Sequence, residues 1–176
     1  MQALDIDAVV SSPNKCLEGV PGFSFVLAKR TLLESCKHRS HSLALDLYDQ
    51  WNGFAETGQF RFTPPTHALV AFDQALKEHE AEGGVEARGD RYSRNAALLV
   101  EGMRKLGFAP LLDAPWAGPV IQTFLSPKDP KFNFEHFAAA LRARGFAIYP
   151  GKLTKRQSFR IGTIGQIDEE VIKAAT

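Results

Sequence analysis

The stretch Val9–Phe23, VVSSPNKCLEGVPGF, places a single lysine in a polar turn between two apolar runs. Asp7–Val10 predicts a short buried strand, and Phe23–Ala28 predicts a second one. The residues between them are rich in serine, proline and glycine, which favour turns. Taken alone, Lys15 is expected to be a solvated turn lysine, although a lysine held in a partly desolvated site becomes a nucleophile toward carbonyls.

The composition is typical of a globular protein, because 44% of the 176 residues are hydrophobic and 23% are charged. The net charge is +1, and this argues against nucleic acid as the main partner, since phosphate binding needs a concentrated basic face. No apolar run is long enough to span a bilayer, and the first residues lack the pattern of a secretory signal. The two cysteines form no CxxC motif, so we expect a cytoplasmic location.

Two helices are predicted in the middle of the chain by apolar residues that recur at helical spacing. The first has Thr66 as its expected N-cap and ends at Gly83–Gly84. The second covers about Val85 to Leu106. Before them, the segment 39–58 predicts an extended stretch that enters a short helix or a loop.

After Gly107 the pattern changes to strand, helix, strand, strand, helix. The strands are VIQTFLSP, FAIYP and SFRIGTIG, and the helices are NFEHFAAALRARG and a final one capped by Asp168. This order predicts a small α+β unit over residues 108–176, distinct from residues 1–107. The whole chain is therefore expected to have an α/β fold with two parts.

Arg160 is a candidate for binding an anion. In a strand, Phe159 and Ile161 point to one face, whereas Ser158, Arg160 and Gly162 point to the other. A guanidinium flanked by small residues can bind a carboxylate or a phosphonate through two hydrogen bonds. The alternative is an edge-strand arginine that faces water.

Two other motifs involve hydroxyl groups and possible metal ligands. RFTPPTH places the hydroxyls of Thr63 and Thr66 just before a helix, an arrangement that suits a phosphate or serves as a simple N-cap. Cys36, His38 and His41 lie close together in the sequence, but no second cluster of ligands lies nearby. We therefore expect no metal site.

Together, these motifs resemble one family. The strings SSPNKCLEGVPGFSFVLAKR, SHSLALDLYDQW, GQFRFTPPTHALVAF, YPGKLT and FRIGTIG resemble, in the same order, segments of the 2-aminoethylphosphonate–pyruvate transaminases. These enzymes are class V aminotransferases that use pyridoxal 5'-phosphate (PLP). The resemblance runs from about Ile6 to the last residues. It implies a fold-type I PLP-transferase, with residues 1–107 as the end of the large PLP-binding domain and its connecting helices, and 108–176 as the small domain.

The resemblance also implies roles for four residues. Lys15 would form a Schiff base with PLP and move a proton between cofactor and substrate. Ser12 would border the cofactor, and Thr63 would reach the cofactor phosphate of the neighbouring subunit in a homodimer. Arg160 would hold the carboxylate of pyruvate or the phosphonate of the amine substrate. The implied reaction converts 2-aminoethylphosphonate and pyruvate into phosphonoacetaldehyde and L-alanine, in phosphonate degradation.

The chain departs from the family in its length and at Pro13, where the family more often has a small residue. Family members are far longer, and their N-terminal half holds the phosphate-binding cup and the aspartate that pairs with the pyridine nitrogen. We therefore expect a C-terminal half with little or no transaminase activity alone. Two alternatives stay open, namely another class V aminotransferase acting on serine, alanine or glyoxylate, and a non-catalytic dimerising module.

Overall fold

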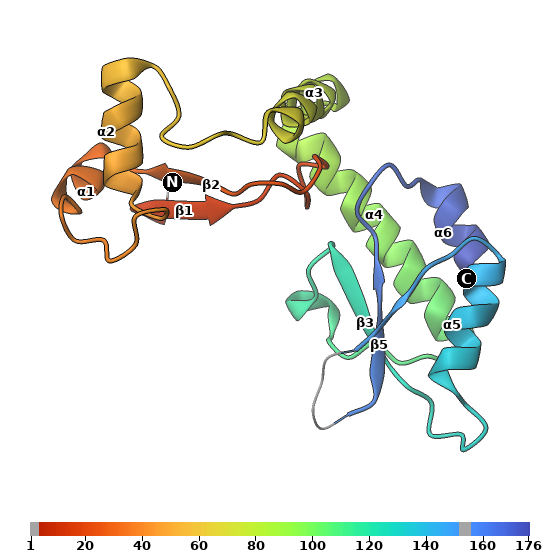
Figure 1. Ribbon diagram of the computed structural model, residues 1–176. Coiled ribbons are helices and arrows are strands. Elements are labelled where there is room, and N and C mark those ends of the chain that lie inside the picture. Colours follow the sequence, from red (N-terminus) through yellow and green to blue (C-terminus); the bar gives the residue numbers. More distant parts are fainter. Residues whose placement is uncertain (1–3, 152–155) are drawn as a thin grey trace. The chain divides into compact units, whose positions relative to one another are not determined.

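The computed structural model describes residues 4–151 and 156–176, and the chain divides into two compact units between Leu76 and Lys77 (Figure 1). The first unit contains β1 (Ala8–Ser11), β2 (Phe25–Ala28), α1 (Arg30–Ser35), α2 (Leu47–Thr57) and the start of α3 (Thr66–Glu82). The second contains the end of α3, then α4 (Gly84–Lys105), η2 (Ala114–Trp116), β3 (Ile121–Leu125), α5 (Phe134–Ala143), β4 (Tyr149–Pro150), β5 (Ser158–Gly162) and α6 (Glu169–Ala175). The predicted domain boundary at residue 107 concerns the longer relatives and stays a prediction.

In the first unit, β1 and β2 form an antiparallel pair whose register runs from Ala8 opposite Ala28 to Ser11 opposite Phe25. Both predicted strands therefore exist, but the prediction that the first is buried is wrong. Val10 is 69% exposed. The physical reason is that the sheet has two strands in the part of the chain described here, too few to bury both of its faces.

Two short helices follow this pair of strands. The sequence did not predict α1, and it left α2 open as a short helix or a loop. The start of α2 is fixed by Asp46, whose carboxylate accepts a hydrogen bond from the Asp49 backbone N–H at 3.0 Å. Its end is fixed by Gly58, which adopts a left-handed conformation with φ of 69°.

The two predicted long helices are confirmed as α3 and α4. Thr66 was expected as the N-cap of α3, and this is wrong by one residue. The carbonyl of Pro65 accepts the first helical hydrogen bond, from the Leu69 N–H at 3.0 Å, so Thr66 is already helical. Gly83, with φ of 108°, separates α3 from α4. No helix in residues 4–151 and 156–176 is both long enough and apolar enough to cross a membrane.

The second unit has a three-stranded antiparallel sheet in the order β3-β5-β4, and the predicted order of strands and helices is confirmed. The alternation predicted for β5 is also present. Phe159 is fully buried and pairs with Phe124, which is also buried. Arg160 lies on the other face, opposite Thr123 of β3 and Tyr149 of β4. One face of β5 therefore packs against the core, and the other face carries the candidate arginine.

Phe159 is the centre of an aromatic core. Five phenylalanine rings have centroids between 5.3 and 6.5 Å from its own: Phe108, Phe124, Phe132, Phe134 and Phe137. Leu99 and Met103 of α4, Leu141 of α5 and Ile172 of α6 complete this core, so the three helices gather on one side of the sheet (Figure 1).

A buried ion cluster joins the end of α3 to the start of α4. The Glu82 carboxylate accepts hydrogen bonds from Arg91 Nε at 2.6 Å, Arg91 Nη2 at 3.1 Å and Arg88 Nε at 2.8 Å. Arg88 is only 3% exposed. The hydrogen bond from Arg91 is the main cause that lowers the pKa of Glu82 from 4.5 to about 2, against the opposing effect of burial.

Replacing Phe159 with alanine should be severely destabilising, because it leaves a cavity among five rings. We expect Phe159→Ala to lower the free energy of unfolding by about 3–5 kcal/mol. Tyr149→Ala is the matched control, since Tyr149 is an aromatic residue that is 63% exposed; its expected cost is about 1 kcal/mol or less. Denaturant unfolding measures both values, and equal costs would contradict this account of the core.

The Glu82 cluster should make stability depend on pH. Because the folded state lowers the pKa of Glu82, the stabilisation is complete above pH 4.5 and is lost as the pH falls toward about 2. Glu82→Gln should lower the free energy of unfolding by about 2–4 kcal/mol at neutral pH. The difference from the wild type should shrink on acidification over the same pH range.

The control for this prediction is Glu101→Gln. Glu101 forms an exposed ion pair with Lys105 at 2.7 Å on α4, and its loss should leave the unfolding free energy almost unchanged, because water and salt screen such a pair. Urea unfolding at a series of pH values gives the comparison. If the destabilisation by Glu82→Gln stayed constant down to pH 2, protonation of Glu82 would not be the cause of the loss of stability in acid.

Candidate active site

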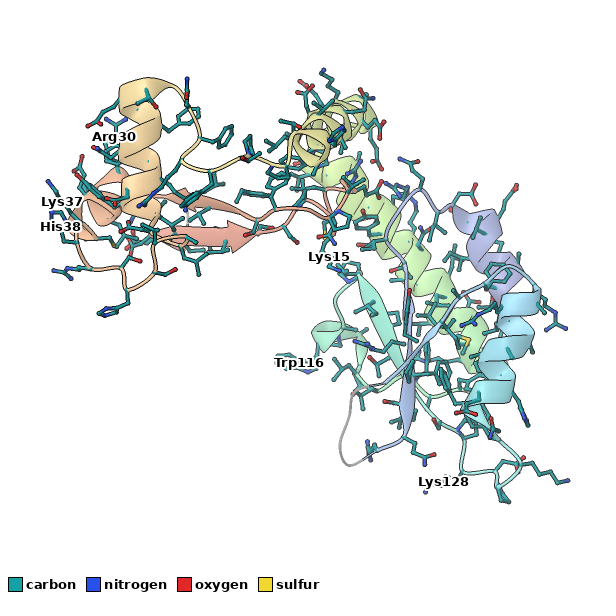
Figure 2. All side chains as sticks on the ribbon, viewed as in Figure 1. Lys15, Arg30, Lys37, His38, Trp116 and Lys128 are labelled. Atoms are coloured by element: carbon teal, nitrogen blue, oxygen red, sulfur yellow. The ribbon has the colours of Figure 1, made fainter. Side chains whose placement is uncertain are left out.

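Lys15 lies in the turn that follows β1, and its side chain is exposed (Figure 2). The turn is closed by its own backbone, because the Glu18 N–H donates to the Lys15 carbonyl at 2.9 Å and the Gly19 N–H donates to the Pro13 carbonyl at 2.8 Å. Among the described residues, no hydrogen bond or ion pair involves the Lys15 amine. The fold therefore holds the backbone of this turn and leaves the amine available.

The turn is anchored by Pro13, which is fully buried although it lies only two residues before Lys15. A methyl group added at Gly19 would come within 3.1 Å of Pro13 Cβ and 3.2 Å of Phe72 Cδ2. Phe72 belongs to α3. Gly19 therefore lies close to both Pro13 and α3, and the buried Pro13 is part of the packing that holds this turn.

A second close approach lies one helical turn earlier on α3. A methyl group at Gly22 would be 2.8 Å from the Cβ of Ala68, which is too close for an unstrained contact. The Phe72 ring also packs on Phe23, which follows Gly22, and on Phe25 at the start of β2, with centroids 5.6 and 5.7 Å apart. The glycines of the sequence NKCLEGVPG therefore permit the Lys15 turn to pack directly on one face of α3.

Ser12 and Thr63, the other predicted cofactor-binding residues of the first unit, differ in burial. Ser12 is half-buried and lies in the same turn as Lys15, whereas Thr63 is exposed and lies three residues before α3. The start of α3 and the Lys15 turn are joined by the packing just described. Arg160 belongs to the second unit.

The backbone of Arg160 is paired within the sheet, but its guanidinium has a hydrogen-bond donor that is not used. Its Nε atom is buried and has no hydrogen-bond partner among the described residues. An unpaired buried donor is costly, and a charged one more so, unless a ligand accepts its hydrogen bond. A planar guanidinium in this state suits a carboxylate or phosphonate group.

Ser158 is a further polar residue of this strand, and the sequence motifs did not indicate it as a binding residue. Its Oγ is also buried without a partner among the described residues, and it lies on the same face of β5 as Arg160, two residues away. The alternation of the strand was the signal that could have identified it. Two unsatisfied polar groups on one face of one strand make this face the stronger candidate for anion binding in the second unit.

The metal ligands considered from the sequence do not assemble into a site. Cys36 is half-buried, and His38 and His41 are exposed. Within residues 4–151 and 156–176, no group of three histidine, cysteine, aspartate or glutamate side chains could hold a metal ion.

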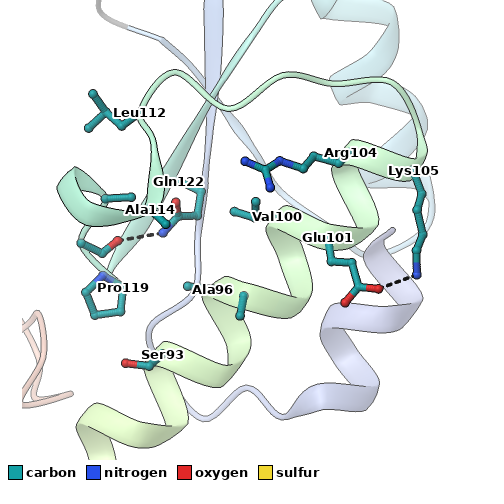
Figure 3. A pocket seen from close by; sticks show the side chains of 13 residues that line it. Ser93, Ala96, Val100, Glu101, Arg104, Lys105, Leu112, Ala114, Pro119 and Gln122 are labelled. Atoms are coloured by element: carbon teal, nitrogen blue, oxygen red, sulfur yellow. Dashed lines mark hydrogen bonds and ion pairs between the residues drawn. The ribbon is translucent and has the colours of Figure 1, made fainter.

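A groove of about 660 Å³ lies in the second unit between α4 and residues 112–122 (Figure 3). Its walls are mostly apolar. Three of its polar side chains already have partners: Ser93 Oγ donates to the Gly89 carbonyl at 2.8 Å, Gln122 Nε2 to the Gly118 carbonyl at 2.7 Å, and Glu101 pairs with Lys105. The groove thus lacks the free nucleophile that the Lys15 turn offers.

The chain matches known transaminases over almost its whole length. It is 56% identical over 167 residues to the 2-aminoethylphosphonate–pyruvate transaminase of Rhizobium meliloti, and 58% identical over 167 residues to 2-aminoethylphosphonate–pyruvate transaminase 1 of Paraburkholderia xenovorans. The chain belongs to this family and corresponds to its C-terminal half. The matches cover 95% of this chain but only 44% and 43% of these relatives, so the chain spans less than half of their length. No protein-family model matches it.

Solved structures of aminotransferases share its fold. The aspartate aminotransferase of Thermus thermophilus matches 99% of this chain with a TM-score of 0.83 at 25% identity, over 48% of its own length. The pyridoxamine–pyruvate aminotransferase of Mesorhizobium loti matches 99% with a TM-score of 0.86 at 23% identity, over 45% of its own length. The PLP-bound phosphoserine aminotransferase of Trichomonas vaginalis matches 99% with a TM-score of 0.75 at 18% identity, over 48% of its own length. The predicted fold-type I class is confirmed.

The packing of the Lys15 turn on α3 can be tested with a pair of glycine substitutions. Gly22→Ala should lower the free energy of unfolding by about 1–3 kcal/mol, because the new methyl group collides with Ala68. Gly53→Ala is the matched control. Gly53 lies within α2 with open space around it, so the same change should stabilise by about 0.5–1 kcal/mol. Two changes of the same sign in denaturant unfolding would contradict the close approach.

Proposed function

We propose that this chain carries the catalytic lysine and the substrate-anion site of a PLP-dependent aminotransferase. The proposed reaction transfers the amine of 2-aminoethylphosphonate to pyruvate, which gives phosphonoacetaldehyde and L-alanine in phosphonate degradation. The observation that carries the proposal is the identity of 56–58% with two relatives named for this reaction, over 95% of the chain.

The residues present fit the cofactor that such a reaction needs. The exposed Lys15 amine, free of partners among the described residues, is suited to bind the aldehyde of PLP. Ser12, in the same turn, would border the cofactor. Thr63 would reach the cofactor phosphate of the neighbouring subunit in a homodimer, and its exposure supports that role.

When bound, PLP supplies an aldehyde carbon that takes up an amine and a ring that draws electrons from the substrate. Lys15 Nζ would hold that carbon covalently between turnovers. Once released by the substrate amine, Nζ would be the base that takes the proton from the substrate carbon and the acid that passes it to the cofactor. The packing of the turn on α3 would keep Nζ within reach during this exchange, since the backbone that carries Lys15 is fixed by Pro13 and Gly19.

Arg160 would orient the substrates through their charged ends. Its guanidinium can donate two parallel hydrogen bonds to a carboxylate of pyruvate or alanine, or to the phosphonate of 2-aminoethylphosphonate. The unpaired Nε atom is a donor that such a group would satisfy. One residue could therefore serve both half-reactions, because both kinds of substrate present an anion.

We also propose where the two parts of the chain would lie in a full-length member of the family. Residues 1–107 would form the end of its large domain and residues 108–176 its small domain, in a cytoplasmic homodimer. The chain alone would have little transaminase activity, since in this family the phosphate-binding cup and the ring-pairing aspartate belong to the N-terminal half.

Chemical trapping tests the role of Lys15. The 176-residue chain is incubated with PLP and reduced with borohydride, and the modified lysines are mapped by mass spectrometry. We expect modification to be concentrated on Lys15. Lys15→Ala should abolish that peak, whereas Lys37→Ala, which removes an exposed lysine of the same unit, should leave it unchanged. Modification spread evenly over the lysines would contradict the proposal.

A further inference from the structure

Two side chains of α4 hold the segment that connects β5 to α6. Arg91 Nη1 donates a hydrogen bond to the carbonyl of Gly165, and Asn95 Nδ2 donates to the carbonyl of Ile167 at 2.8 Å. Figure 1 shows α4 running past this connection. These bonds join residues that lie more than 70 positions apart in the sequence, so they fix the connection to the helix.

Two of the side chains at this connection are shielded from water. Asn95 is 1% exposed and Thr163, the first residue after β5, is fully buried. Thr163 also bonds to the chain before β3, because its Oγ1 donates to the Pro119 carbonyl at 2.5 Å and its N–H donates to the Val120 carbonyl at 3.1 Å. Buried hydrogen bonds of this kind are costly to break, so the end of β5 is held from two sides.

The direction of the Arg91 side chain depends on Glu82. The carboxylate accepts two hydrogen bonds from Arg91, and the guanidinium also lies over the ring of Tyr92, 5.1 Å from its centroid. Glu82 compensates the positive charge of the buried Arg88 as well. Without this carboxylate, Arg91 would lose two of the hydrogen bonds that orient its guanidinium toward Gly165.

We propose that Glu82, Arg91 and Asn95 are positioning residues for Arg160. Arg160 lies on β5, five residues before Gly165, and its Nε atom makes no hydrogen bond within the described residues. The direction of its guanidinium therefore depends on the placement of the strand that carries it. The three residues hold the end of that strand on α4, and so present Arg160 to an anionic substrate group. This inference rests on the proposed function of Arg160.

The test uses the ¹⁵N-labelled 176-residue chain and methylphosphonate as the probe. Binding is followed through the NMR signal of the Arg160 Nε–H group, and the holding of β5 through the hydrogen exchange of the Arg160 and Thr163 backbone amides. Glu82→Gln removes the charge that orients Arg91. Arg91→Lys keeps the positive charge but removes the planar guanidinium, whose several N–H groups bind Glu82 and Gly165 at once. It provides a second variant if the first one unfolds. Glu101→Gln, on the same helix, is the control.

We expect both variants to bind methylphosphonate roughly tenfold more weakly, about the effect of one lost hydrogen bond. Exchange at Arg160 and Thr163 should be faster in both, with no change in Glu101→Gln. Unchanged binding and unchanged exchange in the folded variants would overturn the inference.

A different result would separate this inference from the proposed function. If methylphosphonate leaves the Arg160 signal of the wild type unchanged, the proposed role of Arg160 fails. The exchange rates then decide the positioning role: faster exchange in both variants supports it, and wild-type exchange overturns it.

Discussion

Phe159 packs at the centre of the aromatic core of the second unit, and the next residue of β5, Arg160, must therefore face the other side of the sheet. Successive side chains of a strand point to opposite faces, so the packing of Phe159 fixes the face on which Arg160 lies. A slip of the register by one residue would move Phe159 out of the core and place the guanidinium among the phenylalanine rings, at a large cost in free energy. The five surrounding rings thus specify which face carries the candidate anion site, although none of them lies on that face.

In the first unit, a buried residue and an exposed candidate residue also lie close together in the sequence, but in a turn instead of a strand. Pro13 is buried and Lys15 is exposed, only two residues apart. Gly19 and Gly22 permit the turn to approach α3 so closely that a single methyl group would disturb it. The role proposed for Lys15 needs an available amine on a well-packed backbone, and the exposed side chain and the packed turn both suit that role.

Much of the fold could be predicted because it follows from local patterns. The apolar period of α3 and α4, the glycine at their junction, the Asp168 cap of α6 and the alternation of β5 all depend on neighbouring residues, and the structure confirms them. The burial of β1 was wrong, because burial depends on what covers a strand rather than on its own residues. The motif resemblance led to Lys15 and Arg160, whose roles remain proposals.

The Glu82 cluster shows why other parts of the candidate site could not be predicted. In the sequence, Glu82, Arg88 and Arg91 look like charges on the solvated faces of two helices. Their importance comes from the hydrogen bond that Arg91 donates to Gly165, 74 positions away in the sequence, which only the tertiary structure brings close. Nothing in the sequence around Asn95 indicates that its side chain donates a hydrogen bond to the carbonyl of Ile167.

We propose that Lys15 is the catalytic lysine of a 2-aminoethylphosphonate transaminase, and this proposal can be tested directly. The most direct measurement joins the chain to the N-terminal half of the Rhizobium meliloti relative, with which it shares 56% identity, and follows L-alanine formation from 2-aminoethylphosphonate and pyruvate in the presence of PLP. We expect turnover that Lys15→Ala abolishes. Turnover that survives Lys15→Ala, or a folded PLP-loaded chimera without turnover, would contradict it.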